Sequence, residues 1–186
     1  MCCRLDNPLL PCQPEPRFSL PCSEEMVRSV KIPFPSLTFF QGLQTLMRQE
    51  EARFRRLGFV DTTFGVHIVT PDHVWRYLLA FEVFECREVC EVSTFDLTVI
   101  DFVLKGDLAT WAEMLDNIHQ HGGADVSHSL NTLTHFGERL TLVYDDPDNR
   151  DKFFRFQESI QEFFNLASAL EVEVLVPTAP GVTAAT

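Results

Sequence analysis

The chain has few basic residues, few aromatic residues with a polar group, and no long apolar run. Its 186 residues include 15 Lys and Arg against 27 Asp and Glu, so the net charge is −12. Because phosphate contacts need clustered Lys and Arg, we expect no nucleic-acid partner and no electrostatic docking on anionic membranes. No run of about 18 apolar residues is present, so no membrane span is expected.

Sequence patterns of catalysis are missing as well. No serine lies in a G-x-S-x-G elbow, and no glycine run forms a phosphate-binding loop. Four histidines fall between 119 and 135, but none has the i, i+4 spacing of a helical metal site. We therefore expect no catalysis, no metal and no cofactor. A small enzyme acting on an apolar substrate is the third hypothesis, in which Asp101, His67 and His135 meet inside a pocket.

The six cysteines predict neither disulfides nor a zinc site. Four of them lie in a proline-rich segment without a C-x₂-C pair: Cys2, Cys3, Cys12 and Cys22. No secretory signal is recognisable after Met1, so we expect reduced thiols and a cytoplasmic protein. Cys86 and Cys90 are four residues apart in a predicted strand, and this even spacing predicts that both side chains face the same side.

Phenylalanine is the abundant aromatic residue, with 17 Phe against two Trp and two Tyr. Each buried ring removes about 150–250 Å² from water. At roughly 25 cal/mol per Å², this contributes several kcal/mol per ring before the costs of ordering. The rings can form an ordinary packed core, or some of them can line a cavity for an apolar ligand, and both interpretations stay open at this point.

The chain divides into a central domain and two tails. Closely spaced prolines predict an N-terminal tail over 1–32. The domain covers 33–170. The remaining residues, 171–186, are predicted to form a C-terminal tail, whose last part is rich in Pro, Ala and Thr. Hydrophobic periodicity predicts the elements of the domain in this order: a helix over 37–57, extended segments over 62–70, 76–92 and 95–104, a helix from Asp107 to Gly122, a short helix over 127–133, a strand over 138–144 and a helix that starts at Asp148 or Asn149.

Two of these segments carry most of the bulky apolar side chains. The stretch 95–104 is apolar at nearly every position, which is typical of a strand buried on both faces. The last helix has an apolar face that consists of Phe153, Phe156, Ile160, Phe163, Phe164 and Ala167. Together they favour a protein that holds an apolar ligand over one that performs chemistry.

Three segments resemble the sterol carrier protein 2 family. The first is the opening helix, which reads FFQGL over 39–43 and precedes a set of antiparallel strands. The second is the joint between strand and helix over 101–115, which reads DFVLKGDLATWAEML. The third is 130–142, which reads LNTLTHFGERLTL and precedes a polar turn and an amphipathic helix.

This resemblance implies an α+β (α/β) fold in which helices cover a five-stranded, mostly antiparallel sheet and enclose an apolar tunnel. It implies binding, transport or transfer of a sterol, a fatty acyl chain or another lipid without catalysis. On this interpretation the pocket is lined or closed by Phe102, Leu104, Trp111, Leu115, Leu133, Phe156, Ile160 and Phe163. The alternative is a protein-interaction or assembly module that uses the same fold with a filled core, for example as a homodimer.

Overall fold

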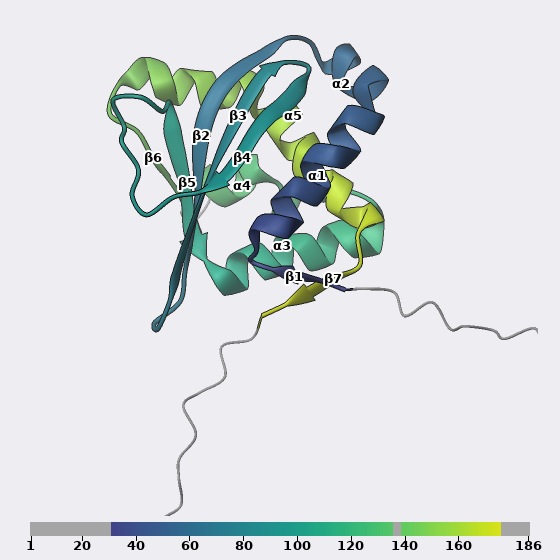
Figure 1. Cartoon of the computed structure of the whole chain (residues 1–186). Helices are drawn as coiled ribbons and strands as arrows, with labels where there is room; N and C mark the ends of the chain where they lie inside the picture. Colours follow the sequence, from purple (N-terminus) through teal and green to yellow (C-terminus); the bar gives the residue numbers. More distant parts are fainter. Residues whose placement is uncertain (1–30, 136–138, 176–186) are drawn as a thin grey trace, which may run out of the picture.

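The structure, a computed structural model, describes residues 31–135 and 139–175 (Figure 1). Its elements are β1 (Ile32–Phe34), α1 (Leu37–Gln49), α2 (Glu51–Leu57), β2 (Val60–Val69), β3 (Val74–Val83), β4 (Glu85–Glu91), β5 (Phe102–Asp107), α3 (Leu108–His121), the 3-10 helix η1 (Val126–His128), α4 (Leu130–His135), β6 (Leu140–Val143), α5 (Pro147–Asn165), the 3-10 helix η2 (Leu166–Ala169) and β7 (Val172–Val174). Within these described ranges, no helix is long and apolar enough to cross a membrane.

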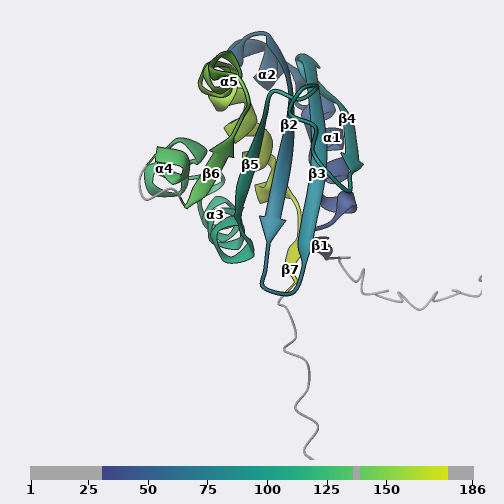
Figure 2. The same ribbon diagram turned by 90° about the vertical axis from the view of Figure 1, so that its left-hand side faces the viewer.

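Five strands form one sheet in the order β4-β3-β2-β5-β6 (Figure 2). The pairs β2–β3, β3–β4 and β5–β6 are antiparallel, whereas β2 and β5 are parallel. The parallel pair arises because the chain leaves the edge strand β4, crosses two strands and pairs again on the far side of β2. The predicted five-stranded, mostly antiparallel sheet is confirmed.

Alternation along the strands gives the sheet an inner face that the helices cover. In β2 the side chains of Phe64, Val66 and Ile68 are fully buried on this face, as the sequence pattern predicts. Figure 2 shows α1 and most of α5 behind the sheet, and Figure 1 shows α3 running below these two helices. Gln44 links α1 to strand β4 of the sheet, since its side-chain amide nitrogen donates to the carbonyl oxygens of Cys86 and Arg87 at 2.9 and 3.0 Å.

The helix starts follow local hydrogen-bonding rules. The Ser36 hydroxyl accepts from the Phe39 amide, as expected for its N-cap position. The last helix begins earlier than predicted, because Asp146 caps it and Pro147 occupies the first turn, where a missing N–H costs nothing. The long helix predicted over 37–57 is divided at Glu50 into α1 and α2.

The prediction of a single strand over 95–104 is wrong. Strand β5 begins only at Phe102, and the preceding residues belong to the crossing between β4 and β5. Here Asp96 forms a local turn, since its carboxylate accepts from the amide and hydroxyl of Thr98 at 3.0 and 2.6 Å. These bonds compete with strand pairing, so the segment does not extend the sheet, and its Phe95 ring packs against β2 at Gly65.

The extended stretch predicted over 76–92 consists of two strands, β3 and β4, joined at Phe84. A β-bulge shifts their register, because Phe81 pairs with Cys86 whereas Ala80 pairs with Glu88. The extra residue reverses the alternation beyond it. Cys86 is therefore buried on the inner face and Cys90 lies on the outer face, so the prediction that both thiols face one side is wrong.

A second, two-stranded sheet joins the ends of the domain. Strand β7 pairs in parallel with β1, which brings Val172 beside Ile32 and Val174 beside Phe34. The segment 171–186, predicted to be a C-terminal tail, thus includes a paired strand. Residues 1–30 of the predicted N-terminal tail lie outside the described part of the chain.

Candidate functional site

The eight predicted pocket residues lie in or beside the hydrophobic core. Seven are buried, namely Phe102, Leu104, Trp111, Leu115, Leu133, Ile160 and Phe163, and Phe156 is half-buried on α5. The Phe102 ring stacks on Phe64 at 5.3 Å between ring centroids. The Phe163 ring meets Phe81 edge to face at 5.1 Å. Several of the rings expected in the tunnel wall thus contact other core rings, and the tunnel itself stays a prediction.

An apolar pocket of about 430 Å³ lies instead at the end of the sheet. We call it the strand-end pocket, and its lining residues are Val69, Thr70, Pro71, Asp107, Leu108, Ala109, Ala112, Val174 and Leu175. They come from the turn between β2 and β3, the first turns of α3 and the end of β7, which all lie in the lower part of Figure 1. Because these segments are far apart in the sequence, no local motif indicates the pocket.

The polar groups around the strand-end pocket are occupied by local hydrogen bonds. The Asp107 carboxylate caps α3 by accepting from the Thr110 amide at 2.6 Å. The Thr70 hydroxyl accepts from the His73 amide at 2.9 Å and donates to the His73 carbonyl at 3.0 Å. The Leu175 amide donates to the carbonyl of Phe34 at 2.7 Å and so holds the end of β7. The walls therefore present mainly apolar side chains.

One predicted residue lies close to this pocket. Leu115 lines a narrow neighbouring pocket of about 60 Å³ together with Asp116, His119, Ala167, Val172 and Val174. The two pockets share Val174. Their α3 residues recur every three or four positions, so they lie along one face of the helix.

A third pocket, of about 380 Å³, contains a further predicted residue, Phe156. It lies between the start of β2 and α5, and Phe59 on its rim has an exposed fraction of 59%. The charged groups of Asp61, Lys152 and Arg155 also line it. This pocket thus combines apolar rings with charge.

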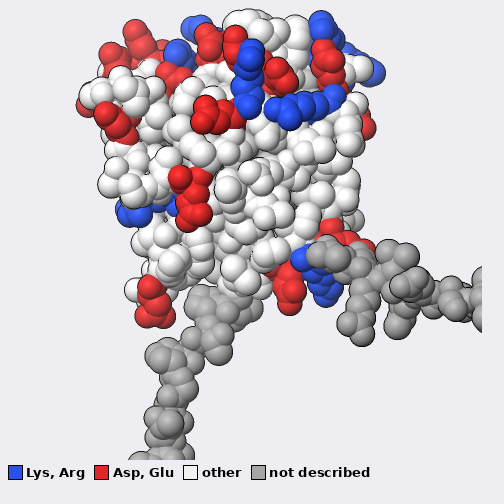
Figure 3. All heavy atoms as spheres, viewed as in Figure 1, with Lys and Arg blue, Asp and Glu red and all other residues white. Residues whose placement is uncertain are grey.

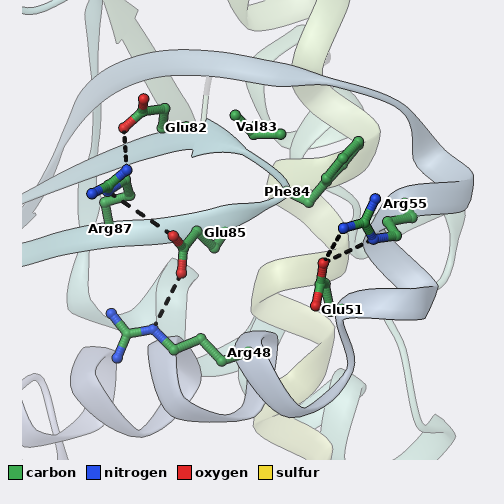
Figure 4. Close-up of a pocket in the computed structure, with 8 residues that line it drawn as sticks. All are labelled: Arg48, Glu51, Arg55, Glu82, Val83, Phe84, Glu85 and Arg87. Atoms are coloured by element: carbon green, nitrogen blue, oxygen red, sulfur yellow. Dashed lines mark hydrogen bonds and ion pairs between the residues drawn. The ribbon is translucent and has the colours of Figure 1, made fainter.

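On the face that Figure 3 shows, most charged side chains lie at the end opposite the strand-end pocket. Figure 3 shows them gathered over α2 and the turn between β3 and β4, with few in the middle of the same face. In the pocket of about 410 Å³ drawn in Figure 4, Arg48 and Arg87 both face Glu85, at 3.5 and 4.0 Å. Arg55 stacks over the Phe84 ring at 4.7 Å from its centroid. This pocket is lined by pairs of opposite charge and is unsuited to an apolar ligand.

Comparison with known proteins identifies the fold. No protein-family model matches the sequence, and no curated protein matches it. The solution structure of a conserved hypothetical protein from Thermus thermophilus, described as a possible sterol carrier protein, is similar with a TM-score of 0.58 at 17% identity. The match covers 77% of this chain and 91% of that one. A crystal structure of sterol carrier protein 2 is similar with a TM-score of 0.54 at 17% identity, over 72% and 95% of the two chains. The chain has the sterol carrier protein 2 fold.

Within this sterol carrier fold, the titratable residues of the enzyme hypothesis make separate contacts. The Asp101 carboxylate accepts from the Thr63 amide at 2.9 Å and from Lys152 at 2.7 Å. The His135 ring packs on Phe154, whereas His67 lies on the outer face of the sheet. In the described part of the chain, no three His, Cys, Asp or Glu residues are placed to hold a metal ion.

Proposed function

We propose that this protein binds a hydrophobic ligand in the strand-end pocket and carries it without chemical conversion. The observation that carries the proposal is an apolar lining around a volume of about 430 Å³, whose polar neighbours are already hydrogen-bonded. Ligand sites typically have volumes of about 300–1,000 Å³ and mostly apolar walls. The names of the two similar structures, a possible sterol carrier and sterol carrier protein 2, support a lipid as the ligand.

The ligand of this proposal is a sterol, a fatty acyl chain or another lipid, which a cytoplasmic carrier would transport between membranes. Its bulk occupies the space between Pro71, Leu108 and Ala112, and its far end reaches past Val174 toward Leu115. The remaining predicted residues would then support the pocket from the core, and only a cavity that opens around a bound ligand would bring them into contact with it.

A variant with a large side chain that fills the strand-end pocket tests this proposal. Ala112 is half-buried in the lining, so Ala112→Trp places an indole where the ligand is expected. We expect the affinity for a fluorescent fatty acid or sterol to fall at least about tenfold, equivalent to about 1.4 kcal/mol. The matched control is Ala52→Trp, an exposed position on α2, which should bind as the wild type does.

Mass spectrometry of an organic extract of the purified protein identifies the ligand directly. An extract without lipid, together with probe binding that is absent or equally strong in both tryptophan variants, would contradict the proposal.

A second function, self-association, is supported by the apolar rings on the surface. Phe59 is 59% exposed and lines the same pocket as Phe156, so two rings from distant segments face one surface hollow. Aromatic residues are enriched in the buried centres of protein–protein interfaces. Light scattering should then show a dimer that Phe59→Ser weakens, whereas a monomer at all concentrations would exclude this function.

A further inference from the structure

Three basic residues lie side by side across the outer face of the sheet. His67 of β2 is paired with Arg76 of β3 on one side and with Lys105 of β5 on the other. Residues paired across neighbouring strands point to the same face, and strands lie about 4.8 Å apart. Lys105, His67 and Arg76 thus form one row about 10 Å long, which we call the basic row.

The basic row has no acidic partner among the described residues. Neither Arg76 nor Lys105 makes a side-chain hydrogen bond or ion pair with them, although most other arginines in this part of the chain are paired with Glu. Asp107, two residues from Lys105 on the same face of β5, is engaged in capping α3. Arg76 and Lys105 lie on either side of β2, so an anion bound between them would be attracted by both charges.

The histidine at the centre has an unused nitrogen. Nε2 of His67 is buried and has no hydrogen-bond partner in the described structure. The Phe95 ring lies beside the imidazole, 5.8 Å away between ring centroids. Burial, followed by the charges of Arg76 and Lys105, lowers the pKa of His67, so the ring is neutral at pH 7. The negative charge of an anion bound between Arg76 and Lys105 would favour the protonated ring.

We propose that the basic row binds the phosphate group of a small, water-soluble phosphate monoester. A phosphate offers several acceptor oxygens, and Arg and Lys are its usual protein ligands. Thr141 of β6, paired with Lys105, adds a hydroxyl at the end of the row. The net charge of −12 opposes approach to anionic lipid surfaces, so the charges favour a soluble phosphate over a phospholipid headgroup.

Histidine NMR of the full-length protein tests this proposal. The His67 ring signals, assigned with His67→Gln, are followed during titration with inorganic phosphate and with glycerol phosphate. We expect saturable shifts, and a pKa of His67 that rises in the presence of phosphate. Arg76→Gln and Lys105→Gln should each weaken binding about tenfold, as expected for the loss of one charged hydrogen bond. The matched control is Arg56→Gln, which removes one charge from an exposed position of α2 and should bind normally.

Thermal unfolding provides a second readout that does not depend on the NMR signals. Phosphate should raise the Tm of the wild type and of Arg56→Gln, but not that of the double variant Arg76→Gln/Lys105→Gln. The proposal would be overturned if phosphate binding were weakened equally in Arg76→Gln, Lys105→Gln and Arg56→Gln. It would also be overturned if binding did not saturate at millimolar phosphate. Binding to vesicles that contain phosphatidic acid, without binding to soluble phosphates, would also overturn it by assigning the row to a membrane.

Discussion

Gly65 shows how one missing side chain shapes the outer face of the sheet. A Cβ atom at this position would lie 2.5 Å from the Phe95 ring, closer than real Cβ contacts allow. Glycine inside a strand usually weakens it, because there is no side chain to pack. Here the aromatic ring of the crossing segment fills that space and rests directly on the strand, which also places it beside His67.

Gly65→Ala should therefore destabilise the protein, because the methyl group forces the Phe95 ring away from the sheet. We expect the free energy of unfolding to fall by about 1–3 kcal/mol, measured by urea denaturation. In a double-mutant cycle, Phe95→Ala should remove most of this cost. Gly123→Ala is the control, since the nearest atom to its Cβ would be in the Asn165 side chain, at 3.4 Å. Strict additivity of Gly65→Ala and Phe95→Ala would show that the ring does not cause the effect.

Among the elements, the junction from α3 to η1 depends on exposed carboxylates. Asp125 caps η1, accepting from the amides of Ser127 and His128 at 2.9 and 3.0 Å, and it also bonds Asn117 of α3 at 2.8 Å. Bonds from Ser127 and His128 hold the pKa of Asp125 well below its usual value. Hydrogen bonding by Arg139 likewise lowers the pKa of Glu113 on α3.

Stability should consequently fall in acid. A carboxyl group whose pKa is lower in the folded state stabilises the fold fully above its unfolded pKa, and this contribution is lost as the pH falls through the folded pKa. We expect the free energy of unfolding to decrease below about pH 4, near the usual pKa of Asp and Glu. Asp125→Asn should reduce this pH dependence in denaturation curves recorded at several pH values. The same dependence in wild type and variant would refute this role of Asp125.

At the scale of the whole molecule, aromatic rings join the sheet to the helices. Phe163 of α5 lies 5.1 Å from Phe81 of β3 and 5.8 Å from Phe164, measured between ring centroids. Trp111 of α3 packs on Phe164 at 5.4 Å. These contacts connect three elements of the domain through ring surfaces and favour the packed-core interpretation of the abundant phenylalanines.

Phe163→Ala should then cost about 3–5 kcal/mol of unfolding free energy, the usual loss for a packed core Phe. Guanidinium denaturation measures it, with the half-buried Phe156→Ala as a control of smaller cost. A ring that lines a cavity loses fewer contacts on truncation. A loss for Phe163→Ala no larger than for Phe156→Ala would therefore favour the internal tunnel.

Much of the fold is predictable because its signals are local. Ser36, Asp107 and Gly122 mark helix ends through hydrogen bonds and a left-handed φ angle that depend on neighbouring residues. The prediction of a strand over 95–104 is wrong because an apolar run can either pair in a sheet or pack over one. The extended segment over 76–92 is long enough for a bend or bulge, but the position of its turn is not predicted, since Val83 adopts a positive φ angle there without being Gly or Asn.

The candidate site depends on contacts that cannot be predicted locally. Leu108 and Ala112 become pocket walls only because Pro71 and Val174, from distant segments, lie opposite them. The basic row likewise requires the register of three strands, and a shift by one residue would send its side chains to the other face.

By itself, the amino-acid sequence determined the acidic charge, the order of most elements and the supply of apolar rings, because composition and periodicity act over short distances. Only the tertiary structure decided which rings pack together, where the apolar pocket opens and which faces Cys86 and Cys90 occupy. The physical reason is that each of these depends on strand register or on contacts between distant segments, and one bulge residue is enough to reverse a face.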